Sequence, residues 1–184
     1  MPRAQGGLAM PVDACTSTFA DLAAVVMPGY MAHLRKAMAA PHQLADFSTP
    51  GVGMRSILKR LKRGSDFAGC YVIMQEGRPM YVGISRCVVS RLRQHCNGTS
   101  HFSATLAYSV AKRKLSSVGK THGVTRDAAM KDEAVREAFD VARQLLRDGT
   151  VAFIEIANAV ELHLFEVYAA IELDTGEWNT FRTH

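Results

Sequence analysis

Six side chains in this sequence have the chemistry needed to hydrolyse a phosphodiester bond. That reaction needs an activated water, neutralised phosphate charge and help for the leaving oxygen. Arginine offers a planar fork of donors to a phosphate, and a glutamate is a suitable ligand for a hard divalent cation. A tyrosine can take a proton from water where nearby positive charge lowers its pKa. The residues in question are Tyr71, Tyr81, Arg91, His95, Glu166 and Asn179.

The two tyrosines lie in apolar runs that the pattern predicts as a β-hairpin. The strands are expected at Ala68–Met74 and Met80–Ile84, joined by a five-residue loop of turn-forming residues. This register places Tyr71 opposite Gly83, with Tyr81 diagonal to Tyr71 on the same face. Because glycine has no side chain, we expect room there for another group to approach.

A helix is expected directly after the hairpin, with Ser85 as its N-cap and Gly98 at its end. Arg91 and His95 are four residues apart, so they project from one face of this helix. Further along, Val151–Ala157 is predicted as a third strand. Val151 and Phe153 are expected on one face, and Ala152, Ile154 and Ile156 on the other.

Glu166 is predicted on an almost wholly apolar helix that begins after Asn158, with Asn158 and Glu161 as a capping pair. A carboxylate in such surroundings is costly unless it is paired or bound to a metal. An ion pair with a basic neighbour is the alternative explanation. The helix is expected to end near residues 174–176, and Trp178–Phe181 is expected to form a short closing strand that contains Asn179.

The order and spacing of these residues resemble those of the GIY-YIG nuclease family. The family has a G-x-Y triplet, a Y-x-G triplet about ten residues later, an arginine in the next helix, then a glutamate and an asparagine. The resemblance covers roughly Phe67 to Phe181, with Cys70 and Val82 in place of the namesake isoleucines. The matching segments are Gly69-Cys70-Tyr71, Tyr81-Val82-Gly83, Arg91, Glu166 and Asn179, with His95 one turn after Arg91.

This resemblance implies an α+β fold with a small three-stranded sheet flanked by helices. It implies that Glu166 holds one Mg²⁺ (or Mn²⁺) per active site, Arg91 contacts the phosphate and Tyr71 is the base. Tyr81, His95 and Asn179 would orient water and backbone groups. The alternative for each tyrosine and for His95 is an ordinary core residue with a satisfied hydrogen bond.

The domain boundaries follow from where the resemblance begins. Residues 1–65 are expected to form an N-terminal helical extension packed on the same domain, and 66–184 the nuclease-like domain. In the extension, Thr18 is expected to cap a helix that Pro28-Gly29 interrupts, followed by a helix at 30–40. Residues 115–148 resemble an insertion, either beside DNA or purely structural, with one long helix over 126–147.

Basic residues provide candidate contacts for a polyanion. The chain has a net charge of +5 and a pI near 9.2. Solvated helix faces are the alternative for these residues. His101 follows His95 by six residues, where some members of the GIY-YIG family carry a polar active-site residue, but an ordinary surface histidine is the favoured interpretation. The candidate nucleic-acid-binding residues are Arg55, Lys59, Arg63, Arg86, Arg93, Lys112, Arg113 and Lys114.

Composition excludes several other classes of protein. The 184 residues suit one domain, and no apolar run reaches membrane-spanning length. The four cysteines lack C-x-x-C spacing, which favours reduced thiols in a cytoplasmic protein over a zinc site or disulfides. No signal peptide is expected.

The function predicted on these grounds is a metal-dependent DNA endonuclease, with a restriction-type enzyme acting on double-stranded DNA as the first choice. Two alternatives are open. One is a DNA-repair or single-strand-specific nuclease, and the other is a nucleic-acid-binding domain that has lost catalysis. A homodimer is expected if both strands are cut by one site per chain.

Overall fold

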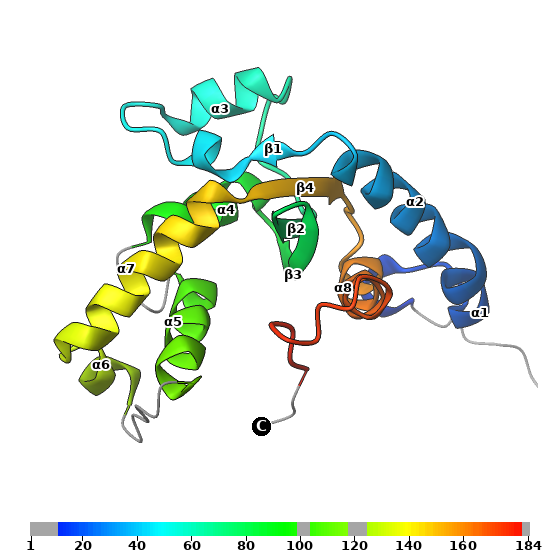
Figure 1. The fold of residues 1–184 in the computed structure, drawn as a ribbon. Coiled ribbons are helices and arrows are strands. Elements are labelled where there is room, and N and C mark those ends of the chain that lie inside the picture. Colours follow the sequence, from blue (N-terminus) through cyan, green and yellow to red (C-terminus); the bar gives the residue numbers. More distant parts are fainter. Residues whose placement is uncertain (1–10, 99–103, 118–124, 182–184) are drawn as a thin grey trace, which may run out of the picture.

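The computed structural model describes residues 11–98, 104–117 and 125–181. These residues form an α+β fold around an antiparallel sheet with the strand order β1-β4-β2-β3 (Figure 1). The expected α+β class is confirmed, but the described sheet has four strands rather than three, because a two-residue segment from the N-terminal part adds an edge. The strands are β1 (His42–Gln43), β2 (Gly69–Gln75), β3 (Arg78–Ser85) and β4 (Thr150–Glu155).

Side chains of β2 alternate between two hydrophobic cores, one on each face of the sheet. Tyr71 and Ile73 belong to the first core, whereas Val72 and Met74 belong to the second. This is the period-two alternation of a strand buried on both faces. The helices of the first core are α3 (Met54–Arg60), α4 (Val88–Asn97), α5 (Thr105–Ser117) and α7 (Glu133–Asp148), and those of the second are α2 (Met27–Met38) and α8 (Ala159–Glu172).

The β2–β3 hairpin has a shorter turn than expected. Glu76 and Gly77 both have positive φ, which is typical of a two-residue type I′ turn, and Gln75 pairs with Arg78. Ile73 pairs with Tyr81 and Met74 with Pro79, so Met80 is the extra residue of a β-bulge. Beyond this bulge the register is the predicted one, with Tyr71 opposite Gly83.

Helix α4 begins where the carboxylate of Asp66 accepts hydrogen bonds from its first turn. The acceptor oxygens of Asp66 lie 2.9 Å from the backbone nitrogens of Val89 and Ser90. The predicted cap, Ser85, instead accepts a bond from the Cys87 backbone N–H. The helix ends at Asn97 and Gly98 follows it, as expected.

The N-terminal segment is an integral layer of the fold. Thr18 caps α1 (Phe19–Asp21) as predicted, and a π-helical turn (Leu22–Val26) then continues directly into α2. Pro28 therefore does not interrupt the helix. Proline lacks an N–H and its ring crowds the preceding turn, and the wider π turn accommodates both effects. Side chains of α2 contribute to the second core, and those of α3 contribute to the first.

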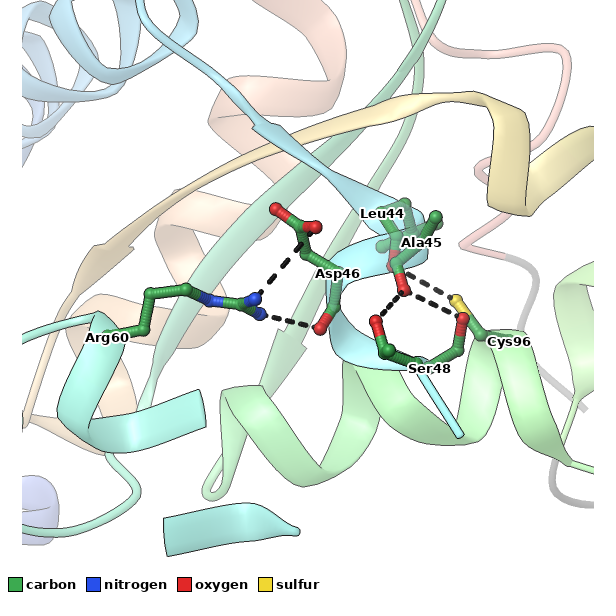
Figure 2. Close-up of polar contacts among 7 residues, drawn as sticks. Leu44, Ala45, Asp46, Ser48, Arg60 and Cys96 are labelled. Atoms are coloured by element: carbon green, nitrogen blue, oxygen red, sulfur yellow. Dashed lines mark hydrogen bonds and ion pairs between the residues drawn. The ribbon is translucent and has the colours of Figure 1, made fainter. Parts of the chain in front are cut away.

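A 3₁₀ turn (Leu44–Phe47) accepts hydrogen bonds from side chains of both α3 and α4 at the β1 edge of the sheet. The Cys96 thiol of α4 donates to the Leu44 carbonyl at 3.5 Å, and Arg60 of α3 donates to the Asp46 carbonyl at 2.6 Å (Figure 2). In Figure 1, α3 lies beside β1, away from the C-terminal segment.

Residues 126–147 form two helices rather than the one predicted. The first, α6 (Arg126–Ala129), is capped by Thr125, and the second, α7, is capped by Asp132. Two arginines of α7 then hold the end of α4. Arg147 donates to the Cys96 carbonyl at 2.7 Å, and Arg143 donates to the Gly98 carbonyl at 3.1 Å.

The C-terminal segment contains no strand up to residue 181, so the expected closing strand is wrong. Strand β4 is present close to its predicted bounds, with Val151 in the first core and Ala152 in the second. Asn158 caps α8 by accepting a bond from the Glu161 N–H, while the Glu161 carboxylate accepts one from the Tyr30 hydroxyl. Within the described ranges, no helix has the length and apolar character required to cross a membrane.

Candidate active site

Tyr71 is buried at the centre of the hairpin face, with 1% of its surface exposed. Its hydroxyl lies 2.8 Å from Nε2 of His95. A Cβ added to Gly83 would lie 2.4 Å from that hydroxyl. The space left by the glycine is therefore filled by Tyr71 itself, and not by an approaching ligand as the sequence suggested.

Tyr71, Tyr81 and His95 form an aromatic cluster. The Tyr71–Tyr81, Tyr71–His95 and Tyr81–His95 ring centroids are 6.3, 5.6 and 6.1 Å apart. The predicted shared face of the hairpin and the predicted helix face that carries His95 therefore meet. Tyr81 is the half-buried member, and it forms part of the wall of a surface pocket.

Arg91 reaches from α4 to α5. Its guanidinium donates to Oγ1 of Thr105 at 3.1 Å and to Oε1 of Gln94 at 3.1 Å. Its charge also acts on the aromatic cluster, because it disfavours a second positive charge on His95. Thr105 lines the same pocket as Tyr81, so Arg91 is anchored to the pocket wall.

The side-chain amide of Asn179 makes the backbone hydrogen bonds that a neighbouring strand would otherwise make to β3. Its Oδ1 accepts from the Val82 N–H at 3.0 Å, and its Nδ2 donates to the Val82 carbonyl at 2.7 Å. These are the two bonds that a neighbouring strand would make to the outer edge of β3. Asn179 therefore fixes the C-terminal segment beside Tyr81, although no closing strand forms.

Glu166 projects from α8 into this pocket. The pocket has a volume of about 280 Å³ and brings together residues from β3, α5, α8 and the C-terminal segment. Among the described residues, no hydrogen bond or ion pair holds the Glu166 carboxylate. The residues that line the pocket are Tyr81, Thr105, Leu106, Ser109, Glu166, Trp178, Asn179, Thr180 and Phe181.

Burial sets the protonation states of the cluster. Burial raises the pKa of Tyr71 and of Tyr81, and the charge of Arg91 opposes this rise without cancelling it. Burial, with a smaller effect of Arg91, lowers the pKa of His95 to about 3. Burial also raises the pKa of Glu166, against the influence of His163. Without an added cation, both tyrosines are therefore protonated and His95 is neutral at pH 7.

The donor set at Glu166 fits one kind of metal site. In the ranges that the structure describes, no three His, Cys, Asp or Glu side chains gather into a ligand cluster. A half-buried carboxylate without a hydrogen-bond partner still suits Mg²⁺, which keeps several waters and takes few protein ligands. Such an ion would be held by Glu166, with water and phosphate oxygens as its other ligands.

The predicted basic residues divide into two groups. Arg63 pairs with Glu155, Arg93 donates to the Val52 carbonyl, and Arg113 pairs with Glu177, so these three stabilise the fold. The others are exposed, and their side chains make no hydrogen bond or ion pair within the described residues; they are Arg55, Lys59, Arg86, Lys112 and Lys114.

Only one of the two basic clusters lies near the pocket. Lys112 follows Ser109 of the pocket wall by three residues on α5, which places the two on one helix face. Arg55 and Lys59 lie on α3, beside the opposite edge of the sheet (Figure 1). Arg55 and Lys59, although candidate nucleic-acid-binding residues, therefore lie on a helix away from the pocket. His101 lies outside the described residues.

Sequence reasoning missed several residues of the site. Asp66 positions α4, Thr105 anchors Arg91, and Trp178 and Phe181 line the pocket. Asp66 lies 23 residues before Val89, the first α4 residue whose N–H it accepts, so no local capping pattern reveals it. The aromatic pair flanks Asn179 and could have been noticed on that ground.

Comparisons of the chain with models of protein families, with curated proteins and with solved structures found no match.

Proposed function

We propose that the protein is a metal-dependent DNA endonuclease of the restriction type, which hydrolyses phosphodiester bonds in double-stranded DNA. The convergence of Tyr81, Glu166 and Asn179 on one pocket, with Arg91 anchored to its wall, is the observation that supports this most. These residues come from four separate parts of the chain. Their meeting accords with the role that the GIY-YIG resemblance implies for each.

Arg91 supplies the contact with the phosphate. Its position against Thr105 and Gln94 fixes the guanidinium, and a fixed fork of donors suits two oxygens of one phosphate. Lys112 extends the positive charge along the face of α5 that carries Ser109, and Lys114 adds charge to the last turns of the same helix. The polyanionic substrate would therefore lie across α5 and the edge strand β3.

Glu166 holds the cation in this proposal. The metal ion, when bound, would supply charge neutralisation at the phosphate and stabilise the leaving oxygen. Burial disfavours the charged form of the Glu166 carboxylate and so raises its pKa. A nearby divalent cation would favour the ionised form. The partly buried Glu166 carboxylate would therefore be more stable in its ionised form when a cation is bound to it.

Tyr81 and Tyr71 have different roles in removing the proton of the attacking water. Tyr81 is the member on the pocket wall, so its hydroxyl is placed to contact the attacking water. Tyr71 lies behind it, with its hydroxyl against neutral His95. Tyr81 would be the base that touches the reacting atoms, and it would act as a tyrosinate. The bound cation, together with Arg91, would lower its pKa so that its own proton leaves to solvent before it takes one from the attacking water. Tyr71, which the sequence favoured as the base, is a positioning residue through its contacts with Tyr81 and His95.

The test of this proposal is single-turnover cleavage of plasmid, linear duplex and single-stranded DNA, with and without Mg²⁺ or Mn²⁺. Glu166→Gln should abolish metal-dependent cleavage and leave DNA binding intact, because it removes the anionic ligand but keeps the size. Glu172→Gln is the matched control, since Glu172 is on the same helix but pairs with Arg35 at the surface. Metal-independent cleavage, or equal activity of the two variants, would contradict the proposal.

A second arm separates the tyrosines. Tyr81→Phe should slow cleavage by roughly 10²- to 10⁴-fold, the usual effect of a general base, with little change in melting temperature. Tyr71→Phe should lower the melting temperature as well, because it leaves buried His95 without its bond. Normal cleavage by Tyr81→Phe would show that this hydroxyl does not touch the reacting water.

Cutting both strands with one pocket per chain favours a homodimer on DNA. Products nicked in one strand only, or cleavage confined to single-stranded DNA, would instead support the repair-type or single-strand-specific alternative. Binding without cleavage under every metal condition would support a domain that has lost catalysis.

A further inference from the structure

The wall of the pocket formed by the C-terminal segment has two aromatic side chains. Trp178 is half-buried against the first core, whereas Phe181 has 51% of its surface exposed. Both line the pocket that contains Glu166 and Tyr81. None of the roles proposed above for phosphate, metal or proton requires an aromatic group at either position.

The aromatic wall is held in place from two directions. Asn179 ties it to β3 through the two bonds with Val82. Arg113 of α5 pairs with Glu177 at 3.2 Å, and its guanidinium carbon lies 5.3 Å from the centre of the Trp178 ring. The rings are therefore presented at a defined place and do not belong to a loose end.

The rest of the lining suits a flat ring with polar edges. Thr105, Ser109 and Thr180 contribute hydroxyl groups and Asn179 an amide, so donors and acceptors surround the aromatic surface. A volume of about 280 Å³ is at the small end for ligand pockets, which commonly have roughly 300–1,000 Å³. One nucleotide fits such a space, whereas a stacked base pair with both strands does not.

We propose that this pocket receives one unstacked nucleobase of the substrate strand, next to the phosphate that is hydrolysed, and that Phe181 stacks on it. This inference rests on the proposed nuclease function. Every base has a π face, so an exposed aromatic ring can stack on any unpaired base with little sequence preference. In a duplex the base would have to leave the stack, and a strand that is already unpaired would avoid that cost.

The chain provides its own probe, because Trp178 is its single tryptophan. A thymidine oligonucleotide should quench Trp178 fluorescence in the presence of Ca²⁺, used in place of Mg²⁺ to prevent cleavage. An abasic oligonucleotide of the same length and charge should quench it less and bind more weakly, by roughly 5- to 150-fold, the range of base–aromatic stacking. Phe181→Ala should remove this difference, and Phe181→Trp should retain it in a binding assay by anisotropy.

Phe19→Ala is the matched control, since Phe19 is also a solvent-exposed phenylalanine but lies outside this pocket. It should bind both oligonucleotides as the wild type does. Equal affinity of the wild type for the thymidine and abasic strands would overturn the inference, and if duplex DNA is still cleaved, the proposed nuclease function stands without it. Failure to bind either strand or duplex DNA would overturn both proposals together.

Discussion

At the scale of single residues, His95 shows most clearly how the fold sets protonation. Its Nε2 contacts the Tyr71 hydroxyl, and its buried Nδ1 has no partner among the described residues. A charged imidazole would need partners for both ring nitrogens, and the nearby guanidinium of Arg91 opposes the charge as well. The neutral ring is therefore part of the folded state.

This neutral histidine should make stability depend on pH in one direction. The folded-state pKa of about 3 lies below the ordinary value of 6.5, so protonation favours the unfolded chain. The contribution is complete above about pH 6.5 and is lost as the pH falls toward 3, by at most about 1.4 kcal/mol per pH unit. Urea unfolding of the wild type and His95→Gln across this range should show a shallower pH slope for the variant.

His33→Gln is the matched control for this measurement, because His33 is an exposed histidine on α2. It should retain the wild-type slope. Parallel slopes for the wild type and His95→Gln would show that His95 does not remain neutral in the folded protein.

At the scale of elements, the hairpin depends on the absence of a side chain at Gly83. A Cβ at this position would lie 2.4 Å from the Tyr71 hydroxyl and 2.8 Å from Cε1 of Tyr81. Gly83→Ala should therefore destabilise the protein by about 1–3 kcal/mol, as overpacking of a core commonly does. Denaturant unfolding measures this loss. Gly64→Ala, where an added Cβ meets nothing within 4 Å, should change stability little, and equal effects at the two glycines would contradict the argument.

The sequence predicted the register of this hairpin through two errors that cancel. The expected loop was three residues too long, but the bulge at Met80 adds a residue on one strand only. The Tyr71–Gly83 pair therefore has the predicted register despite the wrong turn. Glu76 shows why the turn was difficult to recognise, since a type I′ turn usually has Asn or Asp at the position where this glutamate has positive φ.

Other elements could not be derived from local patterns. Asn179 bonds to Val82 across 97 positions of the chain, and a single amide that replaces a strand leaves no alternation in the sequence. Asp132 divides one apolar helical pattern into two helices by capping the second. Pro28 is a strong helix breaker, yet the helix continues through it because a π-helical turn precedes it. Tertiary context decided each of these cases.

At the scale of the whole molecule, the two basic clusters predicted from the sequence lie on helices beside opposite edges of the sheet. Lys112 and Lys114 lie on α5, whose earlier residues line the pocket, whereas Arg55 and Lys59 lie on α3 beside β1. The sequence reveals both clusters but not their positions, because the distance between α3 and α5 depends on how the helices pack on the sheet. If the proposed function holds, the α5 cluster is the one expected to contact DNA near the pocket.

The two clusters should therefore differ in their effect on DNA binding. Replacing Lys112 and Lys114 with glutamine should weaken binding to all sequences and reduce the slope of log K against log salt by about 0.9 per lost phosphate contact. The same change at Arg55 and Lys59, which removes equal charge, should leave the slope nearly unchanged. Fluorescence anisotropy at several salt concentrations measures both, and an equal reduction by the two pairs would mean that DNA also contacts α3.

The bonds between Asn179 and Val82 also affect how this molecule meets other copies of itself. β3 is an edge strand, and an open edge offers unpaired N–H and C=O groups to any extended chain, which is a common route to aggregation. At Val82 both groups are already occupied by one amide, and the C-terminal segment lies across the edge. The residue that the resemblance assigns to the active site is thus also a barrier against strand addition, so solubility and activity place demands on the same side chain.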